Sequence, residues 1–242
     1  MSRFEGEITI YHLIDGAKEA RGTTVIIDVF RAFSLECYLY SMGAAWVRPV
    51  GSLETARSWR EKDPSCLLIG ERHGKKCEGF DFGNSPSSVS AETVGGRGII
   101  HTTSAGTQGI VNAAQADVLL TGSLVNAGAI AAYIKKENPK QVSLVCMGNE
   151  GIRPAAEDEL CALYIRSLLL EEPIPDLAER IADLQFHGGD HFFDSLRQEI
   201  YPEPDFWLCI KKDSFDFVLR VEKDEDGYIS RKIPVNTIKV NN

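Results

Sequence analysis

Short apolar runs alternate with longer segments of helical periodicity along most of the chain. This alternation is typical of βα units, in which each strand is buried on both faces and each helix covers the sheet. The pattern therefore predicts an α/β fold built on a largely parallel sheet. The predicted strands are 23–29, 45–50, 66–69, 98–102, 117–120 and 141–146. The predicted helices are 32–42, 53–62, 87–94, 107–114, 126–137 and 155–170.

The pattern becomes less regular after residue 170. Two prolines within the run 171–175 end the preceding helix, because proline cannot continue it. No internal repeat and no long linker separates two domains, so we expect residues 1–242 to form one α/β domain that the segment from about 171 completes. The segments predicted within this part are a helical region at 176–200 and strands at 206–211, 217–221 and 228–233.

A charged run at 222–227 separates the last two predicted strands and ends in Asp-Gly. This dipeptide favours a tight hairpin turn, although the charge is equally compatible with a solvated loop.

Composition and charge restrict the classes of partner. Of the 242 residues, 43% are hydrophobic and 25% are charged, as in an ordinary globular protein. The 26 Lys and Arg residues against 35 Asp and Glu residues give a net charge of −9, which disfavours nucleic acid as a partner. A small anion could still bind if local Arg side chains, backbone N–H groups or a metal overcame the negative field.

The sequence predicts neither a membrane segment nor a disulfide framework. No apolar run approaches 18 residues and the first residues are mixed and charged, so we expect a cytoplasmic protein without membrane contact. The cysteines are scattered, with no C-x-x-C pair, which indicates reduced and mostly buried thiols. They are Cys37, Cys66, Cys77, Cys146, Cys161 and Cys209.

Polar residues gather where predicted strands end. Asp28 and Arg31 follow the first strand, where the acid could hold a divalent cation and the guanidinium could bind phosphate. The alternative is that Asp28 and Arg31 form an ion pair with each other, which would stabilise the turn between the strand and the helix. Because ligands of open α/β sheets bind outside the carboxyl ends of the strands, such residues are candidates for one common crevice.

A second cluster follows the strand at 66–69. Glu71 and Arg72 end this strand and lead into a glycine-rich loop at 78–86. Glycines allow the backbone to approach a ligand closely. Asn84 and Ser85 precede a proline as helix-capping residues do, and capping is compatible with anion binding.

Two further strand ends add hydroxyls and acids. Glu157 and Asp158 fall in the first turn of a predicted helix, where the helix dipole stabilises acids in any protein. The strand at 98–102 ends in a turn of the kind that cradles oxyanions, without the lysine of a P-loop, so ATP hydrolysis is not indicated. The candidate anion-binding residues of this turn are Thr102, Thr103, Ser104, Gly106 and Thr107.

Taken in order, these segments resemble the 2-phosphosulfolactate phosphatase family, the ComB-like enzymes of coenzyme M biosynthesis. The resemblance covers nearly the whole chain, and the Gly-Phe-Asp-x-Gly-Asn-Ser-Pro run is its most specific part. The motifs that carry it are Asp-x-x-Arg-Ala at 28–32, Gly-Glu-Arg at 70–72, Glu-Gly-Phe-Asp-x-Gly-Asn-Ser-Pro at 78–86, Thr-Thr-x-x-Gly-Thr at 102–107, Glu-Asp at 157–158, and the run at 206–210 with Phe-Asp at 215–216.

The resemblance implies a three-layer α/β/α fold with a mixed, largely parallel sheet and a magnesium-dependent phosphatase that converts 2-phospho-3-sulfolactate to 3-sulfolactate and phosphate. The expected catalytic residues are Asp28, Arg31, Glu71 and Arg72, and the expected magnesium ligands come from Asp28, Glu71, Asp81, Glu157 and Asp158. The residues expected to bind substrate are Asn84, Ser85, Thr102, Thr103, Ser104, Gly106 and Thr107.

Several alternatives stay open. The run 33–35 is Phe-Ser-Leu where the family pattern is Thr-rich, and residues 103–106 differ from its Thr-Asn-Gly turn, so the substrate could be another small phosphoester. A non-catalytic anion sensor is a second reading. An isomerase or lyase with Glu71 and His73 as acid and base is a third. Attack by Asp28 and attack by water are both compatible with the sequence, as are a monomer and a homodimer.

Overall fold

The computed structural model describes residues 3–235. Its strands are β1 Glu7–His12, β2 Gly22–Ile27, β3 Trp46–Pro49, β4 Leu67–Arg72, β5 Lys75–Lys76, β6 Gly98–Thr102, β7 Ala116–Gly122, β8 Gln141–Cys146, β9 Phe217–Asp224 and β10 Gly227–Pro234. Its helices are α1 Leu13–Glu19, α2 Ala32–Ser41, α3 Leu53–Lys62, α4 Ala91–Val94, α5 Gly106–Asn112, α6 Ala127–Glu137, α7 Ala156–Leu170, α8 Leu177–Asp183 and α9 Glu203–Cys209. Short 3-10 turns occur at η1 Pro86–Ser88, η2 Leu124–Asn126 and η3 Asp190–Phe192.

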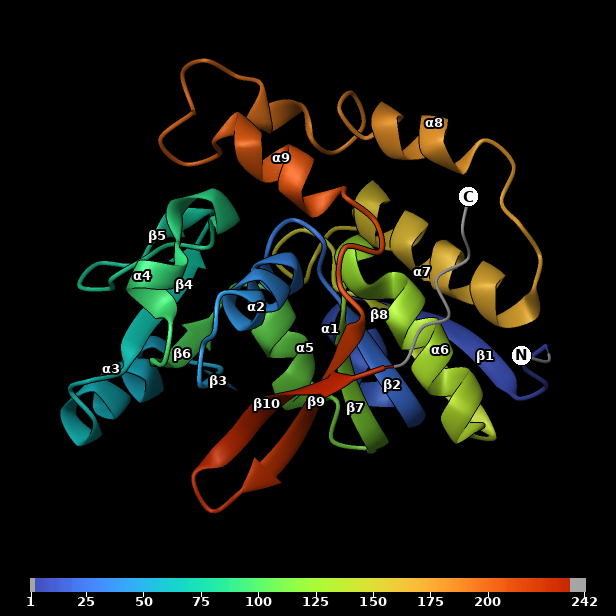
Figure 1. Cartoon of the computed structure of the whole chain (residues 1–242), viewed down its shortest axis with the longest axis horizontal. Helices are drawn as coiled ribbons and strands as arrows, with labels where there is room; N and C mark the ends of the chain where they lie inside the picture. Colours follow the sequence, from blue (N-terminus) through green and yellow to red (C-terminus); the bar gives the residue numbers. More distant parts are fainter. Residues whose placement is uncertain (1–2, 236–242) are drawn as a thin grey trace.

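The strands form one mixed sheet in the order β1-β8-β2-β7-β9-β10-β3-β6-β4-β5 (Figure 1). The first four strands of this order are parallel to one another, and β3, β6 and β4 form a second parallel group. The antiparallel hairpin of β9 and β10 lies between the two groups. The segment after residue 170 therefore supplies the central strands of the sheet.

Helices cover both faces of the sheet, and the pleat of β2 shows how the sequence specifies this. Val25 and Ile27 pack in the apolar cluster formed with α6 and α7, whereas Ile26 packs in the cluster formed with α1 and α5. Successive side chains of a strand point to opposite faces, so an unbroken apolar run is buried from both sides. This arrangement confirms the predicted three-layer α/β fold.

The structure differs from the prediction in three places. The predicted helix 87–94 is divided into η1 and the short helix α4, and β1 and α1 precede the first predicted strand. The run 206–211, predicted as a strand, lies instead within and just after α9. Phe206 and Cys209 are fully buried while Trp207 is half exposed, which is the spacing of a helix face rather than of a strand. Aromatic residues are common in strands, and this misled the prediction. The hairpin after residue 216 is confirmed, with its turn at Glu225 and Asp226.

All six cysteines are buried free thiols, as the sequence predicts. Within residues 3–235, none of the helices combines the length and apolar character needed to cross a bilayer.

Candidate active site

The C-terminal ends of the two parallel groups meet through hydrogen bonds between their loops. The carboxylate of Asp28, which follows β2, accepts a hydrogen bond from the backbone N–H of Gly106 at 2.9 Å. Glu71, in β4, accepts one from the backbone N–H of Ser104 at 2.7 Å. Gly106 and Ser104 both follow β6, so this loop joins Asp28 to Glu71 across the sheet.

A cavity of about 570 Å³ opens at this junction. Residues that follow β2, β4, β6 and β8 line it, together with residues between 187 and 201 of the C-terminal segment. The structure thus brings four of the expected acids to one cavity: Asp28, Glu71, Glu157 and Asp158.

Burial dominates the electrostatics of Asp28. It raises the pKa of this carboxyl from 3.8 to about 6, and the negative charge of Glu71 acts in the same direction. The N–H groups of Ala32 and Gly106 donate to the two carboxylate oxygens and oppose this effect in part. Asp28 is therefore held in a fixed orientation at the floor of the cavity.

Glu157 and Asp158 begin α7 and face the same cavity. Asp158 accepts hydrogen bonds from the N–H groups of Val29 and Gly148, each at 2.8 Å. Glu157 is 7% exposed, and its Oε2 atom has no hydrogen-bond partner among the described residues. Burial and neighbouring carboxylates raise the pKa of Asp158, and burial with the charge of Asp28 raises that of Glu157 to about 8.

These acids offer oxygen ligands to a divalent cation but do not surround one point closely. Among the described residues, the group whose ligand atoms all lie within 4.8 Å of one another is His12, Cys146 and Glu159 instead. Three neighbouring carboxylates repel one another when ionised, and Mg²⁺ prefers such oxygen ligands. The buried Oε2 of Glu157 without a partner is the kind of atom that a cation would satisfy. Asp81, by contrast, does not line this cavity and forms an ion pair with Arg60. Asp28, Glu71, Glu157 and Asp158 are therefore the expected ligands that line this cavity and could supply oxygens to a metal there.

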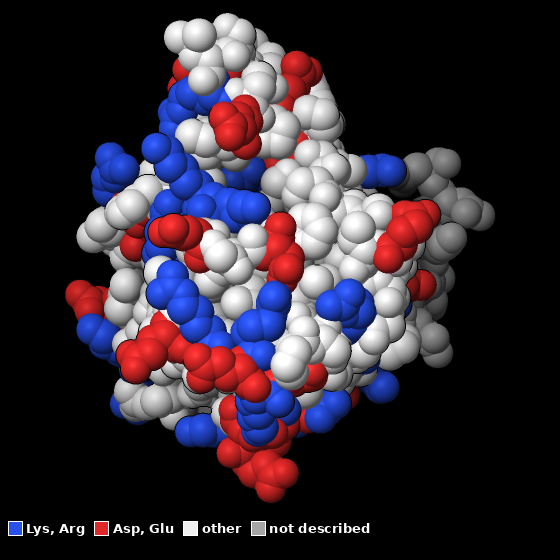
Figure 2. All heavy atoms as spheres, turned by 90° about the vertical axis from the view of Figure 1, so that its left-hand side faces the viewer, with Lys and Arg blue, Asp and Glu red and all other residues white. Residues whose placement is uncertain are grey.

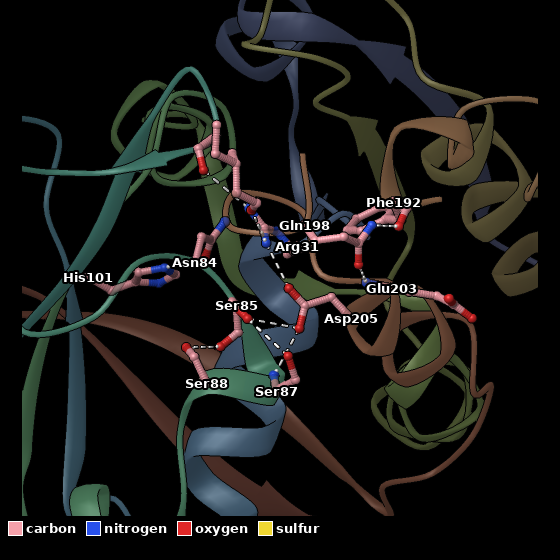
Figure 3. Close-up of polar contacts among 12 residues, drawn as sticks. Arg31, Asn84, Ser85, Ser87, Ser88, His101, Phe192, Gln198, Glu203 and Asp205 are labelled. Atoms are coloured by element: carbon pink, nitrogen blue, oxygen red, sulfur yellow. Dashed lines mark hydrogen bonds and ion pairs between the residues drawn. The ribbon is translucent and has the colours of Figure 1, made fainter. Parts of the chain in front are cut away.

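Arg31 is buried, and its guanidinium donates to three acceptors. It donates to Asp205 at 2.7 Å (Figure 3), to the carbonyl of Ile200 at 3.0 Å and to that of Gly74 at 3.3 Å. It also lies over the rings of Phe192 and Tyr201. The sequence left open whether this arginine binds an anion or forms an ion pair. The structure gives it an ion-pair partner, which is Asp205 of the C-terminal segment rather than the neighbouring Asp28.

Most of the hydroxyls expected to bind substrate build the β6–α5 turn instead. The N–H of Thr103 donates to the hydroxyl of Thr107, and the N–H of Thr107 donates to the hydroxyl of Thr103. The hydroxyl of Thr102 accepts a hydrogen bond from Arg72 at 2.9 Å, and neither side chain lines the cavity. Of this group, Ser104 lines the cavity and also donates to Glu71.

A second cavity, of about 810 Å³, lies on the other side of Arg31 and Asn84, which line both cavities. Ser85 lines this second cavity and donates to Asp205 at 2.9 Å (Figure 3). His73, the candidate general acid, lies at the first cavity, where its Nδ1 pairs with Glu150 at 2.7 Å.

The C-terminal segment contributes cavity residues that the sequence did not reveal. Arg197 lines the first cavity, its guanidinium lies 4.6 Å from the centre of the Tyr201 ring, and it has no carboxylate partner among residues 3–235. His191 lines the cavity too, and burial lowers its pKa from 6.5 to about 4. No motif surrounds either residue, so only the tertiary structure could identify them.

The protein as a whole offers no excess of positive charge to attract an anion, because its formal net charge is −9. On the face formed by the left-hand elements of Figure 1, Lys and Arg side chains are interspersed with Asp and Glu (Figure 2). Local groups in the cavity must therefore supply the positive charge.

The comparison with known protein families agrees with this site. A family model described as 2-phosphosulpholactate phosphatase matches residues 8–224, a range that contains every cavity residue named above. The chain belongs to the 2-phosphosulfolactate phosphatase family. This family consists of phosphoric monoester hydrolases, and the resemblance drawn from the sequence motifs is confirmed.

Curated relatives in the 2-phosphosulfolactate phosphatase family cover most of the chain. A protein of Caldicellulosiruptor saccharolyticus is 35% identical over 212 residues, which cover 80% of this chain and 86% of that protein. One of Caldanaerobacter subterraneus subsp. tengcongensis is 31% identical and covers 88% and 92%. One of Bacillus subtilis is 28% identical and covers 83% and 87%. Each is named a probable 2-phosphosulfolactate phosphatase.

Proposed function

We propose that the first cavity binds a small, multiply anionic phosphoester and hydrolyses its phosphomonoester bond with the help of Mg²⁺. The leading candidate substrate is 2-phospho-3-sulfolactate, which the names of the relatives suggest. The products would be 3-sulfolactate and inorganic phosphate.

One juxtaposition carries the proposal. The acids Asp28, Glu157 and Asp158 line the same cavity as the guanidinium of Arg197, which has no carboxylate partner among residues 3–235. A phosphate dianion is repelled by three carboxylates unless a cation lies between them, whereas carboxylate or sulfonate groups of the same substrate are attracted to a guanidinium. A substrate with anionic groups at both ends matches this distribution of charge.

Asp28, Glu157 and Asp158 would hold the magnesium ion. When bound, it would neutralise the charge that develops on the phosphoryl oxygens during transfer.

The protein's own groups orient the reactants. Arg197 and the amide of Asn84 would bind the carboxylate and sulfonate, and the N–H groups of Ala32 and Gly106 hold the Asp28 carboxylate in place. Either this carboxylate or water attacks phosphorus, the bond between phosphorus and the substrate oxygen breaks, and that oxygen takes up a proton. On the first route water then attacks the phosphorus of the aspartyl phosphate and releases Asp28. A substrate made chiral at phosphorus distinguishes the routes, because two successive displacements retain the configuration at phosphorus and direct attack by water inverts it.

Phosphate release from a panel of small phosphoesters, measured with Mg²⁺ and with chelator, tests the proposal. We expect magnesium-dependent release from 2-phospho-3-sulfolactate. Release from another phosphoester alone would identify that compound as the substrate instead. Saturable anion binding without phosphate release would indicate a non-catalytic sensor. An organic product that retained its phosphate would indicate an isomerase or lyase.

We also propose a cytoplasmic enzyme whose partner is the phosphoester rather than nucleic acid or a membrane. Size-exclusion chromatography with light scattering would show whether it is a monomer or a homodimer.

A further inference from the structure

A buried polar chain leads from the core to Asn84 at the cavity wall. Glu36 in α2 and His101 in β6 are both fully buried, and Oε1 of Glu36 lies 2.8 Å from Nδ1 of His101. On the other side of the ring, Nε2 of His101 lies 3.2 Å from Oδ1 of Asn84. Three elements far apart in the sequence therefore meet in one line of hydrogen bonds.

The position of the proton between Glu36 and His101 does not change what the ring presents to Asn84. Oδ1 of Asn84 faces Nε2 and can only accept, so Nε2 carries a proton; Nδ1 then either donates to an ionised Glu36 or accepts from a protonated one. The amide oxygen of Asn84 can only accept a hydrogen bond. In both forms Nε2–H donates to it and fixes which end of the amide faces His101.

The same orientation points the Nδ2 end of the Asn84 amide away from His101. Asn84 lies between His101 and Arg31, with its amide nitrogen on the side of Arg31 (Figure 3). Asn84 lines both cavities, and no described residue accepts a hydrogen bond from its Nδ2. The amide group therefore offers two unused N–H donors beside the proposed substrate cavity.

The arrangement is costly as a purely stabilising device. Oε2 of Glu36 is buried and has no hydrogen-bond partner among the described residues. A buried acid with one oxygen unsatisfied contributes less to stability than apolar residues of similar volume would. This cost is better explained if the pair serves Asn84.

We propose that His101, held by Glu36, is a positioning residue that locks the Asn84 amide with its N–H donors toward an oxyanion of the substrate. The inference rests on the proposed function of the first cavity and adds a residue that determines how tightly the substrate binds. His101 itself does not line either cavity and would act only through Asn84.

Two matched substitutions separate positioning from packing. Glutamine at 101 is long enough to place an N–H donor where Nε2 lies, whereas asparagine is one bond too short. We expect His101→Asn to raise the KM for 2-phospho-3-sulfolactate about 10-fold or more, the usual effect of losing a hydrogen bond to a charged group. His101→Gln should restore most of the binding, and kcat should change much less than KM in both variants.

A double variant tests whether His101 acts through Asn84. Asn84→Ala should raise KM by a similar factor, and Asn84→Ala combined with His101→Asn should be no worse than Asn84→Ala alone. Thr121→Val is the control for a polar substitution in the core, because Thr121 is buried in β7 and takes no part in the hydrogen bonds that join Glu36, His101 and Asn84. Independent multiplication of the two KM effects would overturn the proposal, as would equal KM values for His101→Asn and His101→Gln.

The side-chain amide signal of Asn84 gives a readout that does not depend on turnover. In ¹⁵N spectra, with the signal assigned by its loss in Asn84→Ala, we expect it to move in His101→Asn and to return toward its original position in His101→Gln. An unchanged signal in His101→Asn would refute the positioning role even if no substrate were hydrolysed. Absence of turnover in the unmodified protein, with the amide signals behaving as expected, would instead refute the proposed function.

Discussion

The carboxylate of Asp28 and the backbone N–H of Gly106 form a 2.9 Å hydrogen bond between the loops that follow β2 and β6. These strands belong to different parallel groups of the sheet, which are otherwise connected through the β9–β10 hairpin. The bond thus holds together the two halves of the cavity floor.

Gly106 admits no larger side chain at this junction. A Cβ atom there would lie 2.9 Å from Oδ2 of Asp28 and 2.9 Å from Cζ of Phe33. We expect Gly106→Ala to lower the free energy of unfolding by about 1–3 kcal/mol, as overpacking does, and to reduce phosphate release. Gly51→Ala, where the new Cβ would meet Val111 at an ordinary 3.5 Å, is the control and should be near neutral. Urea unfolding measures both, and equal stabilities would contradict this account.

The buried pair of Arg31 and Asp205 should be expensive to break. Asp205→Ala would leave a guanidinium buried without its counter-charge, so we expect a loss of about 3–5 kcal/mol in the free energy of unfolding. Replacing both partners, by Arg31→Met together with Asp205→Leu, should lower the free energy of unfolding clearly less than the single change does. Urea denaturation of the unmodified protein, Arg31→Met, Asp205→Leu and the double variant gives the coupling, and additive effects would show that the pair does not act as a unit.

Stability should depend on pH and Mg²⁺ through Glu157. Its pKa is raised from 4.5 to about 8, so between these values the folded protein binds more protons than the unfolded chain. The stabilising contribution is present below pH 4.5 and is lost as the pH rises through 8. We expect the Tm without metal to fall over this window, and Mg²⁺ to raise Tm more at pH 8 than at pH 6. Glu157→Gln should weaken both effects, and an unaltered magnesium response would exclude it as a ligand.

Arg197 should govern affinity for the anionic end of the substrate. It lines the cavity and has no carboxylate partner among the described residues, so its removal should affect binding more than folding. We expect Arg197→Ala to raise KM about 10-fold or more with little change in Tm, and Arg197→Lys to recover part of the loss. Arg220→Ala, at a half-buried arginine on β9 that does not line the cavity, serves as the control. An unchanged KM in Arg197→Ala would remove this residue from the site.

His191 should make the protein less stable in mild acid. Burial lowers its pKa from 6.5 to about 4, so between these values the unfolded chain binds a proton that the folded protein does not. Its unfavourable effect on stability therefore grows as the pH falls from 6.5 to 4. His191→Gln should reduce the decrease in Tm between pH 7 and pH 5. An identical decrease in the variant would show that other groups control this region of the profile.

The sequence anticipated much of the fold because local patterns encode it. The apolar run of β2 and the helical periodicity of α3 specify these elements without reference to the rest of the chain. The prediction failed at α9, where Phe206 and Trp207 suggested a strand. Burial of Phe206 and Cys209 on one side of that segment, a tertiary contact, decides in favour of the helix.

The acids of the candidate site could also be predicted, since Asp28, Glu71, Glu157 and Asp158 follow strands whose carboxyl ends share an edge. The roles of the arginines could not. Asp205 neutralises Arg31 from a position 174 residues away, and Arg197 reaches the cavity from a segment without any motif. Periodicity and strand ends are properties of neighbouring residues, whereas the partner of a charge depends on how distant segments pack. The sequence by itself determined most of the elements and the position of four of the five expected carboxylates, and only the tertiary structure decided which arginine at the cavity lacks a carboxylate partner among the described residues.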